Sequence, residues 1–147
     1  SRGDKRQIIE ISIENFSLKI LPLICYEIIY SGKLFENHNF DLIINISEDG
    51  WFGKSIGPNQ HFAHSILRAI ESGKYILRSA NNGIAAIINP LGIVEKKVKF
   101  GESGYIDFKE SKKIKPTTFS KYGNKIFIIL IFLYIFIIFS FNRIKNE

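Results

Sequence analysis

The sequence predicts an α/β domain followed by one transmembrane helix. Apolar runs of strand length alternate with helical spacing over the first hundred or so residues, which is the pattern of a layered α/β fold. The run 126–141 then carries no charge and only two hydroxyls, those of Tyr134 and Ser140. Such a run is typical of a membrane span. We therefore divide the chain into a domain over 1–108, a basic juxtamembrane linker over 109–125 and a transmembrane helix over 126–142.

The first part of the domain is predicted to consist mainly of strands. Isoleucine alternates with polar residues over 9–14, which is the period of a half-buried strand. The segments 18–25 and 41–47 are apolar over most of their length, as in strands that are buried on both faces. A short helix is expected between them, from after Glu27 to about Asn39.

The second part is predicted to contain one amphipathic helix and several antiparallel strands. Apolar residues recur at helical intervals over 62–70, and Gly73 is expected to end that helix. YILRSA and IAAIIN follow as two strands around an Asn-Gly turn. The runs 93–100 and 105–108 are expected to be final edge strands.

The net charge of +6 is concentrated next to the apolar run. A polybasic segment beside a membrane span is attracted to anionic head groups by about 1 kcal/mol per basic residue. We find no nucleic-acid-binding motif, so we expect a membrane and no nucleic-acid partner. The basic residues before the run are Lys109, Lys112, Lys113, Lys115, Lys121 and Lys125.

Cys25, in the stretch PLICYEII, is the candidate nucleophile. As the only cysteine it excludes a disulfide within the chain, and by residue type alone it would be a buried core side chain. Its position favours chemistry, because reactive groups in open α/β sheets gather beyond the carboxyl ends of strands. The backbone N–H of Tyr26 could bind the oxyanion of an intermediate, and Glu27 is the nearest acid. The residues alone leave both interpretations open.

Two aromatic residues and two histidines form further candidates. Trp51 and Phe52 lie in a glycine-rich loop, where they would either bind a ligand or anchor the loop itself. His61 and His64 could share one helix face, but no acidic residue stands at metal-ligand spacing, so no metal site is expected. A dyad of Cys25 with a histidine stays open. Three charged residues are interpreted as structural ion-pair formers: Arg68, Glu71 and Arg78.

Three blocks of sequence carry a family resemblance. PLICYEII, NISEDGWFGKSIGPNQH and RAIESGKYILRSANNGIAA, followed by an NPLG turn, resemble the C-terminal half of a nitrilase-type domain. More closely, they resemble the apolipoprotein N-acyltransferases of bacterial inner membranes, over nearly the whole chain. The resemblance implies an α-β-β-α sandwich that sits on membrane helices and carries a Glu-Lys-Cys catalytic set.

The resemblance also implies residue roles and partners. Cys25 matches the nucleophile, which would take an acyl group from a phospholipid as a thioester and pass it to the N-terminal amine of a diacylglyceryl-cysteine on an apolipoprotein. Tyr26 and Glu27 match residues needed beside the nucleophile, and Glu27 would be a supporting acid. Trp51 matches a loop tryptophan that, together with Phe52, faces the substrate. No cofactor is implied. The family places the domain in the periplasm, although the lysines before the apolar run would favour the cytoplasm by the positive-inside rule.

The chain departs from the family pattern in what it lacks. The family's general-base Glu and catalytic Lys precede the nucleophile strand, and nothing before Cys25 matches them. The chain also contains no methionine and begins SRGDKRQ, so we expect a C-terminal fragment that is inactive without the upstream half of the same enzyme. Two alternatives remain: a nitrilase-type amide hydrolase, and a non-catalytic, membrane-anchored remnant of a split gene.

Overall fold

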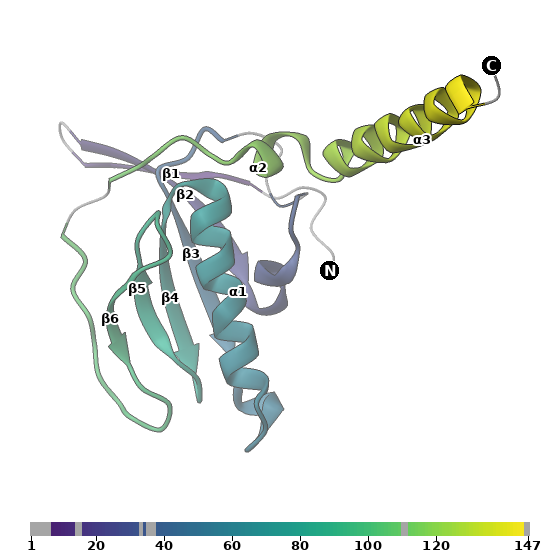
Figure 1. The fold of residues 1–147 in the computed structure, drawn as a ribbon. Coiled ribbons are helices and arrows are strands. Elements are labelled where there is room, and N and C mark those ends of the chain that lie inside the picture. The colour runs from purple at the N-terminus through teal and green to yellow at the C-terminus, as the bar shows by residue number, and fades with distance from the viewer. Residues whose placement is uncertain (1–6, 14–15, 33, 35–37, 110–111, 146–147) are drawn as a thin grey trace.

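A six-stranded mixed sheet forms the centre of the structure (Figure 1). The computed structural model describes residues 7–13, 16–32, 34, 38–109 and 112–145. The strands lie side by side in chain order. They are β1 (Ile9–Ile13), β2 (Phe16–Ile24), β3 (Leu42–Glu48), β4 (Tyr75–Asn81), β5 (Ala85–Ile88) and β6 (Val94–Val98).

The central strands β2, β3 and β4 run parallel, and the outer pairs are antiparallel. Parallel neighbours require crossover connections. The connection from β3 to β4 contains the short 3₁₀ helix η2 (Gly50–Phe52) and the helix α1 (Gly57–Ser72), which covers one face of the sheet (Figure 1). The connection from β2 to β3 begins with the 3₁₀ helix η1 (Cys25–Ile29). The carboxyl ends of β2 and β3 therefore meet at the same edge of the sheet, near the start of α1.

Strand alternation separates two apolar faces. On the face toward α1, the core contains Leu23, Ile43 and Ile76, each at most 1% exposed. Burial of an Ile or Leu side chain contributes roughly 1.5–3 kcal/mol. Toward the end of β3 the same face becomes polar, with Asn45 and Ser47 both buried. The apolar packing thus fixes the register that brings these polar side chains beneath the end of β2.

The opposite face of the sheet, which we call the outer face, is only partly covered. Its own apolar cluster is built around four residues and packs against Ile106 and Phe108. Alternation also places Ile9, Ile11, Ile24 and Ile46 on this face, and each of them is at least 43% exposed. The four buried members of the cluster are Ile20, Leu42, Tyr75 and Ile87.

Two expectations about secondary structure were wrong. The described residues between Glu27 and Asn39 form no helix beyond the end of the 3₁₀ turn η1, and residues 33 and 35–37 lie outside the described part of the chain. The left-handed Gly32 (φ 67°) is unfavourable for helix continuation. The run 105–108 does not form an edge strand. It lies across the outer face, where Ile106 and Phe108 pack against the apolar cluster and the Phe108 ring lies 5.1 Å from that of Tyr75.

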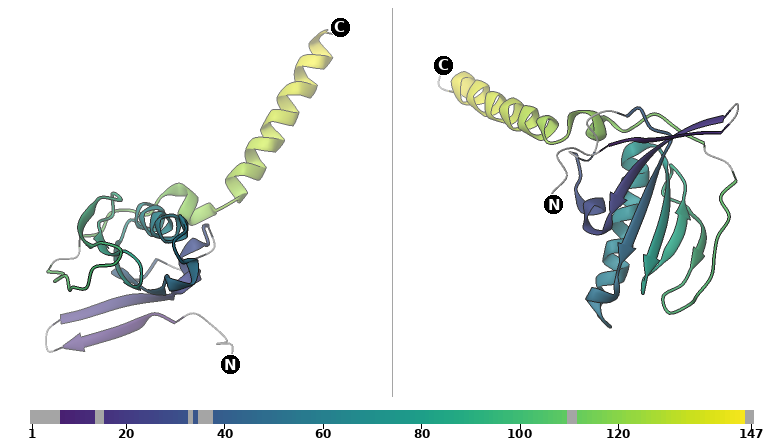
Figure 2. Two further views of the ribbon diagram at one scale, coloured as in Figure 1. Left: turned by 90° about the horizontal axis from the view of Figure 1, so that it is seen from below. Right: turned by 180° about the vertical axis from the view of Figure 1, so that it is seen from behind.

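The segment after this run returns along the end of α1. Ile114 N–H donates to Gly73 O (2.9 Å) and Thr117 N–H donates to Glu71 O (3.1 Å). Lys113 pairs with Asp41 at 2.7 Å. The short helix α2 (Thr118–Tyr122) follows, and α3 (Lys125–Lys145) then projects away from the sheet (Figures 1 and 2). The described residues of the predicted basic linker therefore run along the domain surface.

The helix α3 occupies the place of the predicted transmembrane helix. Every side chain from Phe127 to Phe139 is at least 40% exposed. Among the described residues, however, no helix combines the length and the apolar character that crossing a membrane requires. The apolar run 126–141 rises about 24 Å at 1.5 Å per residue, whereas the hydrocarbon core is about 30 Å thick. The helix expected over 126–142 is present, and its role as a span is not confirmed.

Candidate functional site

Cys25 lies in a sharp turn between β2 and η1. Its φ of 48° is in the left-handed region, which non-glycine residues rarely adopt. The left-handed conformation costs roughly 1–2 kcal/mol. Strained strand-to-helix turns of this kind present nucleophiles at the tops of α/β sheets. Cys25 is half-buried at the position where such a nucleophile is expected.

The carbonyl oxygen of Cys25 accepts two side-chain hydrogen bonds. Asn45 Nδ2 donates to it at 3.3 Å and also to Leu23 O at 3.2 Å. His61 Nε2 lies 3.2 Å from the same Cys25 oxygen. Because a carbonyl can only accept, the Nε2 nitrogen of His61 carries a proton in this contact. Two such bonds contribute roughly 0.5–1.5 kcal/mol each, which is enough to offset the strain of the turn.

A buried ion pair lies beneath this turn. Arg78 Nη2 donates to both carboxylate oxygens of Asp49, at 3.0 and 2.7 Å, and both side chains are fully buried. The other guanidinium nitrogens of Arg78 donate to Asn45 Oδ1, to Ser65 Oγ at 3.3 Å and to Ile84 O at 3.2 Å. Arg78 therefore fixes the carboxylate and, through its bond to the Asn45 oxygen, turns the Asn45 amide nitrogen toward Cys25.

Asp49 collects hydrogen bonds from three sides. Besides Arg78, Ser47 Oγ donates to Asp49 Oδ1 at 2.7 Å and His61 Nδ1 lies 2.9 Å from the same oxygen. Burial alone would raise the pKa of Asp49. The bond from Ser47, the charge and bond of Arg78 and the contact with His61 outweigh it and hold the pKa below its usual value. The carboxylate is therefore ionised at neutral pH, and it orients both Ser47 and His61.

The thiol of Cys25 has one recorded polar neighbour. Ser47 Oγ lies 3.7 Å from Sγ, and among the described residues no carboxylate or lysine reaches the sulfur. His61 contacts the Cys25 carbonyl and not its thiol. A Cys25–His dyad, left open by the sequence, is thus not formed here. The described residues supply a presented thiol without a general base.

Tyr26 and Glu27 both lie beside Cys25 in η1. The Tyr26 ring is 53% exposed and packs 5.3 Å from the His61 ring. Glu27 Oε2 accepts the backbone N–H of Ile24 at 2.8 Å, across the turn. Glu27 therefore braces the backbone on the strand side of Cys25, in a supporting position.

Phe52 and Trp51 separate in the structure. Phe52 packs against the rings of Tyr26 (6.3 Å) and His61 (5.6 Å) and lines a pocket of about 290 Å³ that His64 also lines. Trp51 is 87% exposed on the same loop. The fold therefore brings Phe52 to the Cys25 turn and leaves Trp51 at the surface.

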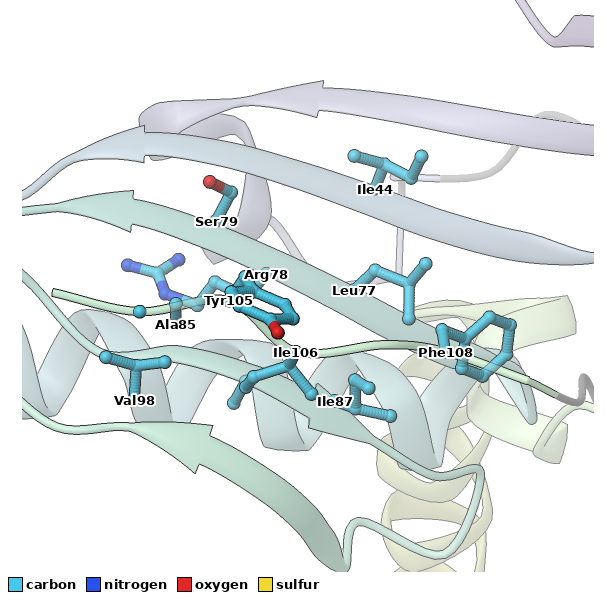
Figure 3. Close-up of a pocket in the computed structure, with 12 residues that line it drawn as sticks. Ile44, Leu77, Arg78, Ser79, Ala85, Ile87, Val98, Tyr105, Ile106 and Phe108 are labelled. Atoms are coloured by element: carbon cyan, nitrogen blue, oxygen red, sulfur yellow. The ribbon is translucent and has the colours of Figure 1, made fainter.

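A second pocket, of about 310 Å³, lies on the outer face (Figure 3). Its side chains come from β3, β4, β5 and β6 and from the segment that carries Tyr105 and Phe108, as the close-up shows. None of the five residues predicted for the site lines it. The pocket is a gap between the sheet and the segment 104–108 that partly covers it. We assign it no part in the candidate site.

Sequence reasoning missed three residues of the site. Asn45, Ser47 and Asp49 were not singled out, although they occupy every second position at the end of an apolar strand. That period of two is a detectable signal, because it directs all three to one face of the sheet. Arg78 was correctly interpreted as an ion-pair residue, and so were Arg68 and Glu71, whose Nε and Oε2 atoms lie 3.1 Å apart.

Comparison with known sequences relates this chain to one family. The model of the family described as "Carbon-nitrogen hydrolase" matches residues 1–109. An apolipoprotein N-acyltransferase of Rickettsia bellii (strain RML369-C) is 50% identical over 128 residues, which cover 86% of this chain and 26% of that protein. The corresponding enzyme of Rickettsia prowazekii (strain Madrid E) is 44% identical over 137 residues, which cover 92% of this chain and 28% of that protein. The chain thus spans about a quarter of the length of these relatives.

Comparison with solved structures concerns the fold alone. A point mutant of the amidase from Nesterenkonia sp. AN1, with the acetamide moiety of fluoroacetamide added covalently at its active site cysteine, is similar with a TM-score of 0.51. The likeness covers 68% of this chain and 40% of that chain at 13% sequence identity. A second structure of the same mutant, modified by acrylamide, gives a TM-score of 0.50 with 13% identity over 68% of this chain and 41% of that chain.

Replacement of Asp49 by Asn should destabilise the domain strongly. It leaves the Arg78 charge buried without a counter-charge, which typically costs about 3–5 kcal/mol of unfolding free energy. The pKa of Asp49 is lower in the folded state. The stabilisation that the ionised Asp49 contributes to the folded state is therefore complete above the unfolded-state pKa of about 3.9, and it is lost as the pH falls through the folded-state pKa. Urea unfolding between about pH 7 and pH 3 should show this acid loss in the wild type and a smaller one in Asp49→Asn.

The matched control is Asp41→Asn, which removes the partly exposed pair with Lys113. Such surface pairs contribute about 0–1 kcal/mol. An Asp49→Asn variant no less stable than the Asp41→Asn control would contradict the role given to the buried pair.

Proposed function

The chain belongs to the carbon-nitrogen hydrolase family, and from that membership we propose that it is the nucleophile-bearing C-terminal part of a membrane acyltransferase. The observation that carries the proposal is the left-handed turn at Cys25, held over a buried polar network at the end of a parallel strand. The similarity to apolipoprotein N-acyltransferases over most of the chain supports the choice of reaction.

The proposed reaction has two acyl-transfer steps. The Cys25 thiolate attacks the ester carbonyl of a phospholipid, a C–S bond forms, the ester C–O bond breaks and the lysophospholipid oxygen takes up a proton. The N-terminal amine of a diacylglyceryl-cysteine on an apolipoprotein then attacks the thioester. A C–N bond forms, the C–S bond breaks, the amine loses a proton and the thiolate is regenerated.

The proposal requires catalytic groups from outside the described residues. Ser47 is the one side chain among them that is recorded near Sγ, and Asp49 is already engaged with Arg78. A thiol needs a base to become the reactive thiolate. We assign the general-base Glu and the Lys of the catalytic set to an upstream part of the same enzyme, and the chain by itself is inactive. Tyr26 and Glu27 support the nucleophile, and Phe52 and Trp51 contact substrate.

The same upstream part covers the outer face of the sheet. Ile24 and Ile46 are cross-strand neighbours there, next to Cys25, and are 70% and 60% exposed. Apolar surface of this kind on a sheet calls for a second layer. The relatives are about four times as long as the matched region, so they contain ample chain to supply that layer. The domain over 1–108 thus supplies one sheet and the helix that covers it to a larger α-β-β-α sandwich.

α3 lies in the apolar layer of a bacterial inner membrane. Its apolar side chains are exposed on all sides, and the lysines before it are exposed as well. Lipid would cover the apolar side chains of α3, while anionic head groups would attract the lysines. The domain lies on the periplasmic side, where the acyl donor and the apolipoprotein acceptor meet.

Acylation of Cys25 tests the function directly. The chain is expressed alone, and also joined in frame to the upstream region of one of the similar acyltransferases, and the Cys25 peptide is analysed by mass spectrometry. The joined protein should carry a hydroxylamine-sensitive fatty-acyl adduct, whereas the chain alone should carry a free thiol. Cys25→Ala in the joined protein is the control and should abolish lipoprotein N-acylation. Unchanged N-acylation in Cys25→Ala would sink the proposal, as would a joined protein that hydrolyses small amides and acylates nothing.

Charges introduced into α3 test the membrane assignment. Ile131→Lys combined with Ile135→Lys places two ammonium groups in the middle of the helix, each at about 2.5–3.5 kcal/mol on insertion scales. The variant should leave the membrane fraction in a flotation assay. Leu91→Lys is the matched control, because Leu91 is also exposed (65%) but lies in the loop between β5 and β6, and it should float with the membrane. Equal flotation of both variants would contradict the assignment.

A further inference from the structure

We propose that His61 and Asn45 are positioning residues for Cys25, whose N–H donors hold the Cys25 carbonyl oxygen and thereby keep the thiol presented at the strand end. The inference rests on the proposed role of Cys25 as the nucleophile. It assigns His61 and Asn45 a role that is separate from those of Cys25, Tyr26 and Glu27.

The two donors approach one oxygen from different elements. Asn45 comes from β3 and His61 from α1, and their nitrogens lie 3.3 and 3.2 Å from Cys25 O. Asn45 is fully buried and His61 is 2% exposed, so bulk water has little access to replace either donor. The turn is thus tied to both the strand and the helix that flank it.

Neither donor is free to turn away. The Asn45 oxygen accepts from Arg78, which leaves its amide nitrogen facing the backbone carbonyls of Leu23 and Cys25. The Nδ1 edge of the His61 ring faces Asp49 at 2.9 Å, which directs the Nε2 edge toward Cys25. The orientation of both donors therefore originates in the buried Asp49–Arg78 pair.

Loss of the carbonyl contacts would release the left-handed backbone. A Cys25 residue with a more ordinary φ would point its Cα–Cβ bond in another direction and move the sulfur relative to the substrate. A displacement of the order of 1 Å at a reacting atom can slow catalysis about 100-fold.

Two amide substitutions at His61 separate the two edges of its ring. In His61→Gln the amide nitrogen can stand near the position of Nε2 and keep the donor to Cys25 O. In His61→Asn the shorter amide can stand near Nδ1, where it keeps the contact with Asp49 but not the one with Cys25. Ser65→Ala is the control, because Ser65 is buried in the same network through Arg78 and has no recorded contact with Cys25.

The single cysteine permits a direct spectroscopic readout. Cysteine labelled with carbon-13 at the carbonyl gives one backbone signal for the whole chain, that of Cys25. In detergent micelles this signal should move upfield in His61→Asn, because a hydrogen bond to the carbonyl is lost, and should stay near the wild-type position in His61→Gln and Ser65→Ala. An unmoved signal in His61→Asn would overturn the inference.

The Asn45→Asp variant keeps the test decisive if His61→Asn fails to fold. One carboxylate oxygen still accepts from Arg78, while the other replaces the amide nitrogen and cannot donate to Cys25 O, so the same upfield shift is expected. An unshifted signal in a folded Asn45→Asp protein would also overturn the inference.

The consequence for catalysis is measured in the protein joined to the upstream region. The rate of thioester formation at Cys25 should fall about 100-fold in His61→Asn, and His61→Gln should recover most of it. Equal losses in the two variants would mean that His61 only fills space, which would overturn the positioning role. A wild-type protein that never becomes acylated, but whose carbonyl signal responds as described, would reject the proposed function and support the carbonyl contacts.

Discussion

A buried ion pair between Asp49 and Arg78 is the interaction on which the rest of the candidate site depends. Two charges with no exposed surface are tolerated only when every donor and acceptor around them is satisfied. That demand fixes the neighbours, because the carboxylate orients Ser47 and His61 while the guanidinium orients Asn45. Even the backbone opposite the carboxylate is constrained, since a Cβ on Gly83 would clash with Asp49 Oδ2. The Cys25 turn is part of this network, because Asn45 and His61 both contact its carbonyl oxygen.

The sheet explains why this network can exist. The parallel strands β2 and β3 end side by side, and α1 begins above them, so residues distant in sequence converge on one carbonyl group. The α1 side of the sheet is complete, with a packed apolar core beneath the polar network. The outer face is not, and Ile24 and Ile46 remain exposed beside the nucleophile turn. In our account both this open face and the missing base belong to the upstream part of the enzyme.

The features that could be predicted from the sequence depend on hydrophobic periodicity and on the glycine and turn residues that end helices and strands. The strand runs and α1, with its end at Gly73, follow from hydrophobic spacing, and the position of Cys25 at a strand end follows from the strand itself. The fate of 105–108 could not be predicted in the same way, because a short apolar run fits an edge strand as well as a cover for the outer face. Tertiary burial decided that choice.

The polar network was hidden from sequence reasoning for another reason. The network forms only in the folded chain, where Arg78 of β4 and His61 of α1 contact Asn45 and Asp49. The pattern of a single sequence does not report such tertiary contacts. The left-handed φ of Cys25 was equally invisible, since glycine is the usual signal of that conformation and none is present.

The coupling between Asp49 and the backbone of Cys25 tests the account most directly. Cys25→Gly relieves the left-handed strain, and its effect on the unfolding free energy is measured by urea in the wild type and in Asp49→Asn. If the ion pair holds the strained turn, the turn relaxes in Asp49→Asn, and Cys25→Gly should be more favourable in the wild type by about 1 kcal/mol. An identical change in both backgrounds would show that the turn is independent of the pair, and would contradict the account.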